Sequence, residues 1–241
     1  MKFNAPKVIM GLVLSVLMPL YFPSAQAVTN WIVWDGAPGS YPDDAPGVSY
    51  ASSATGYLLD PLTSEIINVT FNGEVASWSQ FNGASAFNPF EEVTTFSSPS
   101  VDNLPPAGNF ITITGYSGLT NTLTFSKPVT NILMAIGSLG GVSAGSYLFD
   151  ATPTVLSHGS GAWGAEIIPL QVINGTEVYG QEGNGMVQFF GTLTSISWTT
   201  PNPEVYSAFN LGITSVPEPS SLSLLVFGMA GLAALRRRKS D

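Results

Sequence analysis

The chain has 241 residues, no cysteine and a formal net charge of −9 at pH 7. Between residues 28 and 215, Lys127 is the single basic residue against fourteen of the sixteen acids, so this segment carries a charge of 1 − 14 = −13. Too few cations remain to neutralise phosphates, which excludes nucleic-acid binding and argues against attachment to an anionic bilayer surface. The segment is long enough for one domain with a sizeable core, which no disulfide supports.

The N-terminus predicts an export signal. Lys2 and Lys7 frame a basic start, residues 8–20 are apolar, and Ala25 and Ala27 form the small-x-small pattern of a cleavage site. We therefore expect residues 1–27 to be a signal peptide that is cleaved after Ala27, with a retained signal anchor as the alternative.

Residues 28–215 predict many short strands with turn signals about every ten residues. The segments with strand-like patterns are residues 31–34, 66–71, 74–80, 110–114, 122–125, 132–139, 146–149, 154–156, 167–173, 186–190, 193–198 and 208–214. Asn72-Gly73 and Asn174-Gly175 are hairpin signals, and Pro169 indicates an edge strand or a bulge. No long window has helical periodicity, so we expect an all-β fold, an antiparallel β-sandwich of the jelly-roll type.

One motif suggests a serine hydrolase. Gly141 to Gly145 matches G-x-S-x-G around Ser143, and Asp150 and His158 follow in the order of an α/β-hydrolase triad. That motif needs a strand-to-helix turn in a parallel sheet, and no helix is predicted after Ser143. We therefore expect no catalytic triad.

The remaining glycine and acidic motifs are equally weak signals. Gly159 to Gly164 matches G-x-G-x-x-G, but a strand-like segment follows it where a dinucleotide site needs a helix, so a turn is expected. His158 is the only histidine, which leaves zinc without partners. A structural calcium ion is compatible with Asp35, Asp43, Asp44 and Asp60, although their spacing fits neither an EF-hand nor a nonapeptide calcium repeat. We assign no cofactor and no metal ligand, and the pair Glu91-Glu92 does not define a glycosidase site.

Five tryptophans are candidates for a sugar-stacking surface. Trp198 lies in a strand and is expected in the core. Trp163 lies in a glycine-rich turn and is the candidate for an exposed glycan contact.

The last 26 residues, 216–241, predict a membrane-targeting tail. Pro217, Glu218 and Pro219 precede an apolar run from Leu222 to Leu235, and the basic residues Arg236, Arg237, Arg238 and Lys239 follow it. The run would form roughly 24 Å of helix, somewhat less than a bilayer core, so we expect a marginal transmembrane helix. The basic end would stay cytoplasmic, with residues 28–215 outside; a buried helix of a soluble domain is the alternative.

This tail resembles the PEP-CTERM sorting signal of exopolysaccharide-producing Gram-negative bacteria. The resemblance implies recognition by a membrane-embedded exosortase, cleavage near Pro217-Glu218-Pro219 and delivery to the cell surface, with the inner membrane as a transient anchor. Residues 121–140 and 182–213 also look like segments of PEP-CTERM surface proteins of unassigned function.

Three functions remain open from the sequence. The first is a non-enzymatic structural or adhesive protein of the cell surface or extracellular matrix, linked to exopolysaccharide or biofilm. The second is a lectin-like, carbohydrate-binding β-sandwich. The third is an exported hydrolase that uses scattered carboxylates.

Overall fold

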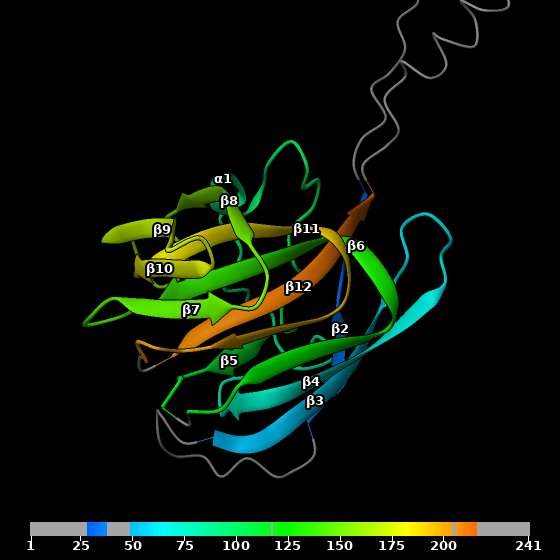
Figure 1. Cartoon of the computed structure of the whole chain (residues 1–241), viewed down its shortest axis with the longest axis horizontal. Coiled ribbons are helices and arrows are strands. Elements are labelled where there is room, and N and C mark those ends of the chain that lie inside the picture. The colour runs from blue at the N-terminus through cyan, green and yellow to red at the C-terminus, as the bar shows by residue number, and fades with distance from the viewer. Residues whose placement is uncertain (1–27, 38–48, 117, 204–205, 216–241) are drawn as a thin grey trace, which may run out of the picture. The chain divides into compact units, whose positions relative to one another are not determined.

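A computed structural model of the chain describes residues 28–37, 49–116, 118–203 and 206–215 (Figure 1). Within these ranges the chain forms twelve strands and one short helix. In chain order they are β1 (Val28–Trp31), β2 (Val33–Gly36), β3 (Ser49–Leu59), β4 (Ile66–Ala76), α1 (Val93–Phe96), β5 (Ile111–Ile113), β6 (Asn121–Leu139), β7 (Gly145–Phe149), β8 (Pro153–Gly159), β9 (Ile168–Ile173), β10 (Glu177–Gln181), β11 (Gly183–Thr199) and β12 (Ser207–Ser215).

Every strand pair is antiparallel, which confirms the all-β antiparallel class. Hydrogen bonds connect all the described strands into one sheet with the order β2-β3-β4-β6-β11-β7-β10-β9. Outside that path, β12 pairs with β1, β5 and β6, and β8 pairs with β11. The sheet is therefore continuous rather than two separate sheets, and the sandwich and jelly-roll arrangement stays a prediction.

The two longest strands, β6 and β11, each change partners along their length. The first part of β6 pairs with β4 and its second part with β12, and Figure 1 shows β6 curving between the two. At this point the register between β6 and β11 shifts. Thr130 and Ile132 are two residues apart in β6, but their partners Thr192 and Phe189 are three residues apart in β11. Asn131 and Gly191 lie in the slipped stretch with φ of 55° and 95°. Facing bulges of this kind bend a sheet, so they redirect both strands together.

The second half of β6 separates two hydrophobic clusters. Ile132, Met134 and Ile136 belong to the larger cluster, and Leu133 and Ala135 to the smaller one. Successive side chains of a strand point to opposite faces, so alternate residues of β6 enter different clusters. All five are fully buried, so this part of β6 is a central strand covered on both faces.

The predicted hairpin at Asn72-Gly73 is wrong. β4 runs through it to Ala76, and Asn72 pairs with Ser53 of β3 on one side and Thr122 of β6 on the other. Gly73 serves a different purpose, since a Cβ there would lie 2.9 Å from the Cα of Asn121. The glycine allows a close approach of two strands.

Other strand boundaries also differ from those predicted. Residues 122–125 and 132–139 form one strand, β6, and residues 186–190 and 193–198 form one strand, β11. Asn174-Gly175 does turn the chain from β9 into β10, with φ of 53° and 82°. Pro169 lies in β9, at the end of the strand order, as the edge prediction requires.

Candidate functional site

The two ends of the described domain lie side by side. β1 pairs with β12 from the first residue, Val28 opposite Ser215, and the Val28 amide donates to the Ser215 hydroxyl at 3.3 Å. The adjoining loop ties both strands down, because the Thr29 amide donates to Asp102 at 2.9 Å and the Thr214 hydroxyl donates to the Ser100 carbonyl at 3.1 Å. The residue after the predicted signal peptide therefore neighbours the residue before the tail.

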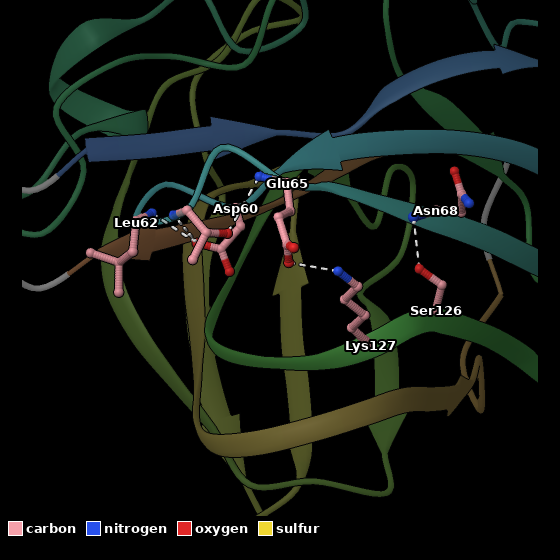
Figure 2. A network of polar contacts seen from close by, with 7 residues as sticks. Asp60, Leu62, Glu65, Asn68, Ser126 and Lys127 are labelled. Atoms are coloured by element: carbon pink, nitrogen blue, oxygen red, sulfur yellow. Dashed lines mark hydrogen bonds and ion pairs between the residues drawn. The ribbon is translucent and has the colours of Figure 1, made fainter.

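A polar turn between β3 and β4 lies beside this end (Figure 2). The Asp60 carboxylate accepts hydrogen bonds from the backbone amides of Leu62 and Thr63 at 2.8 and 2.9 Å. The bond from Thr63 is the main cause that lowers the pKa of Asp60 below its ordinary value of 3.8. An exposed ion pair, Lys127 with Glu65 at 2.6 Å, joins the turn to β6.

An open pocket of about 250 Å³ lies at the same place, lined by residues 60–62, 128–131 and 213–215. Lys127, the sole cation in residues 28–215, is already paired with Glu65. The hydrogen-bonding groups that line the pocket are typical of a turn next to a strand end. They do not converge on one point as the groups of a reaction centre would.

Four aromatic side chains form a second surface feature, which we call the aromatic ridge: Trp78, Tyr206, Trp163 and Phe87. The ring centroids of Trp78 and Tyr206 lie 5.4 Å apart, those of Tyr206 and Trp163 4.7 Å apart, and those of Trp163 and Phe87 5.3 Å apart. The Trp163 and Tyr206 planes are nearly perpendicular, at 86°. The ridge is thus continuous but not flat.

The inner side of the ridge is fixed by the smaller hydrophobic cluster. Trp163 packs against that cluster and over Gly137 of β6, where a Cβ would lie 3.3 Å from the indole ring. Phe87 contacts the buried Phe110 edge-on. The outer side is open, since Trp78 is 58% exposed and Phe87 40% exposed.

The sequence indicated Trp163 as an exposed aromatic residue but not Trp78, which is the more exposed of the two. Trp78 follows the end of β4, where its two serine neighbours are turn residues, and this is the signal that points to the surface. The core prediction for Trp198 is confirmed, since this ring is 1% exposed.

The residues of the hydrolase motif have separate partners. The His158 ring nitrogen Nδ1 lies 3.0 Å from the carboxylate of Glu166, and Asp150 accepts from the Ser197 amide at 2.9 Å. No helix follows Ser143, because β7 begins at Gly145. Gly161 and Gly164 exchange backbone hydrogen bonds at 2.8 and 3.1 Å, which confirms a turn at the G-x-G-x-x-G match.

Among the described residues no three acidic or histidine side chains gather as metal ligands. The Asp60 carboxylate accepts hydrogen bonds from its own turn. At Asp35 the contact is with the main chain, because the Asn82 side-chain amide donates to the Asp35 backbone carbonyl at 2.7 Å. Asp43 and Asp44 lie outside the described residues.

The targeting residues also lie outside the described residues. These are Ala25 and Ala27 of the cleavage site, Pro217, Glu218 and Pro219 of the sorting motif, and Arg236, Arg237, Arg238 and Lys239 of the basic end. Among the parts of the chain that the structure describes, no helix has the length and hydropathy of a membrane span.

Comparison with known proteins identifies one family signature. Residues 215–239 match the family model of the PEP-CTERM protein-sorting motif. No curated protein and no solved structure matches the chain. The signature begins at Ser215, the last residue of β12.

Proposed function

From the premise that the chain carries a PEP-CTERM protein-sorting motif, we propose that it is a non-enzymatic surface protein with a structural or adhesive role in an exopolysaccharide or biofilm matrix. The motif implies an exported, membrane-anchored precursor that an exosortase processes and that is sorted to the surface. The β domain between residues 28 and 215 is then the part that acts outside the cell.

The motif carries this proposal, and its position at the end of β12 supports it. Ser215 is held in the sheet by β1, and the Pro217-Glu218-Pro219 motif follows after one residue. Two prolines so close to a strand end have no backbone N–H to donate, so the sheet is not expected to extend through them. Cleavage near this motif would leave every described strand intact.

A non-enzymatic role is supported by the positions of the ionisable groups. His158 and Asp150 are engaged in different local contacts, and Asp60 stabilises a turn. The buried Glu74 accepts hydrogen bonds from Thr114 and Gly115. Each of these groups has a structural partner of its own, which favours a structural or binding role over a hydrolase.

The test is a comparison of tail variants expressed in a host with an exosortase. Deletion of residues 217–241 should release the domain into the periplasm or medium, because the apolar run and the basic end are both lost. Replacement of Pro217, Glu218 and Pro219 by alanine is the matched control, since it keeps the apolar run and should leave unprocessed precursor in the membrane fraction. Unchanged membrane association after the deletion would contradict the proposal.

A further inference from the structure

We propose that the aromatic ridge is a binding site for an uncharged polysaccharide. This inference deepens the proposed surface function, on which it rests, by naming the class of ligand. It starts from the exposure of Trp78 and Phe87, because large aromatic rings normally bury their apolar area in a core. These two exposed rings are the ends of a row of four in which each ring contacts the next, and the middle two, Tyr206 and Trp163, are half-buried. A continuous apolar patch of this kind marks an interaction site more often than isolated exposed residues do.

The chemistry of the ridge fits sugar rings. The face of a pyranose carries C–H groups, which pack against the electron-rich face of an indole or phenol. The polar side chains of the segment around Trp78 and Phe87 are all neutral: Ser77, Ser79, Gln80, Asn82, Ser85 and Asn88. Most of them already make hydrogen bonds within the domain, such as Ser79 to the Ala76 carbonyl and Asn88 to the Pro105 carbonyl, so the stacking of sugar rings on the aromatic side chains carries the proposal.

The charge distribution selects an uncharged ligand. The ridge residues belong to segments 75–90, 159–165 and 206–215, none of which contains a charged residue, although residues 28–215 together carry −13. Glu166, the first acid after Trp163, is turned to His158. An anionic polymer would be repelled by the domain as a whole and would find no cation at the ridge. A neutral polymer meets neither obstacle.

The place of the ridge in the fold also suits this role. Tyr206 immediately precedes β12, whereas the sorting motif starts at its other end. Nine residues of strand separate the two by about 30 Å. Ser215, where the matched sorting motif begins, therefore lies at the end of β12 away from the ridge.

The experiment measures retention of the full chain, solubilised in mild detergent, on insoluble polysaccharides. The uncharged probes are a β-1,3-glucan, cellulose and dextran beads, and calcium alginate is the anionic probe. We expect retention on at least one uncharged probe, unchanged between low and high salt, and none on alginate. Trp78→Ala should weaken this retention about tenfold or more, the loss of a well-stacked ring, and Trp78→Phe should recover part of it.

Two controls separate loss of the site from loss of the fold. Tyr116→Ala removes a ring that is 61% exposed but outside the ridge, and it should bind as the unchanged chain does. Trp78 is itself mostly exposed, so Trp78→Ala should keep the thermal midpoint and the near-ultraviolet circular dichroism of the core. Trp163→Ala should also weaken retention, but with some loss of stability, because Trp163 packs over Gly137.

Three outcomes would overturn the inference: no retention on any uncharged probe, equal retention of the Trp78→Ala variant, or retention that requires low salt. A ridge variant that instead changes the sedimentation of the chain would make the ridge a protein interface. Surface delivery of the same variants is measured in cells. Normal delivery without retention rejects the ridge alone, whereas failed delivery of the unchanged chain rejects the proposed function.

Discussion

Glu74 is a fully buried carboxylate that orders the loop after β5. Its oxygens accept from the Thr114 amide at 2.9 Å, from the Thr114 hydroxyl, and from the Gly115 amide at 2.8 Å. In Glu74→Gln one acceptor oxygen becomes a donor that faces another donor. We expect a loss of about 1–3 kcal/mol in the free energy of unfolding, measured by chemical denaturation.

The matched control for Glu74 is Glu65→Gln. Glu65 is exposed, and its ion pair with Lys127 lies in water. Surface pairs contribute about 0–1 kcal/mol, so this variant should stay close to the unchanged chain. Equal stability of the two variants would show that Glu74 has no special role.

The lowered pKa of Asp60 predicts that the stability contributed by the β3–β4 turn depends on pH. The amide of Thr63 favours the ionised carboxylate and lowers its pKa below 3.8. A lowered folded-state pKa contributes stability that is present above the ordinary value and is lost as the pH falls through the lowered value. An NMR titration of the Asp60 carboxyl should therefore show a pKa below 3.8, and Thr63→Pro, which removes the donor, should raise it. A pKa at or above 3.8 in the unchanged chain would contradict this reading.

Single residues were predictable where local chemistry decides their place. Trp198, which alternates with polar neighbours in a strand, was predictable as core. The burial of Glu74 was not, because its partners Thr114 and Gly115 are about forty residues away in the chain. The ridge could be suspected at Trp163 but not assembled, since its four rings come from separate segments that only the fold brings together.

At the scale of elements, two identical dipeptides had different outcomes. Asn174-Gly175 has both residues at positive φ and makes a hairpin. Asn72 has no positive φ, because strands on both sides hold it extended. The local preference of Asn-Gly for a turn is overridden when two neighbouring strands supply ladder hydrogen bonds. β6 also passes through Pro128 without ending, and this proline lies between the paired residues Phe125 and Val129, where no ladder hydrogen bond is needed from it.

The attachment of β1 to β12 depends on one small residue. Trp31 pairs with Gly212, and a Cβ there would lie 2.8 Å from the indole ring and 2.9 Å from the Asn30 carbonyl oxygen. Gly212→Ala should therefore cost about 1–3 kcal/mol in the free energy of unfolding. It should also speed amide hydrogen exchange along β1.

The control for Gly212 is Gly141→Ala, where the nearest atom to a Cβ, in the Glu182 carboxylate, is 3.9 Å away. This substitution should change the stability by less than about 0.5 kcal/mol. If the backbone amides of β1 exchanged their hydrogens at the same rate in both variants, close packing at Gly212 would not control the attachment of β1 to β12.

At the scale of the whole molecule, the excess of acids predicts a response to salt. Residues 28–215 carry −13, and self-repulsion of this kind destabilises a compact state. Added sodium chloride should raise the melting temperature by screening it. A variant with Glu91→Gln and Glu92→Gln, both exposed, should melt higher at low salt and respond less to salt. A melting temperature that falls with added salt would contradict this prediction.

The all-β class of the fold and the sorting motif could both be predicted from the sequence, for different reasons. Alternating β-branched segments and turn residues determine an all-β antiparallel fold, and a sorting motif is linear by nature. The path of the sheet was not readable, because it depends on the paired bulges at Asn131 and Gly191 and on contacts between distant strands. The aromatic ridge depends on that path, since its four rings come from separate segments.

The position of β12 has a mechanical consequence. β1 and β5 pair with one edge of β12 and β6 with the other. If the domain is held at its C-terminal end, beyond Ser215, and a bound polymer pulls on Tyr206 of the ridge, the load runs along the axis of this strand. The hydrogen bonds on both edges would then be strained in shear, all at once, rather than peeled apart one pair at a time. A strand loaded in this way resists force far better than a hairpin pulled open from its ends.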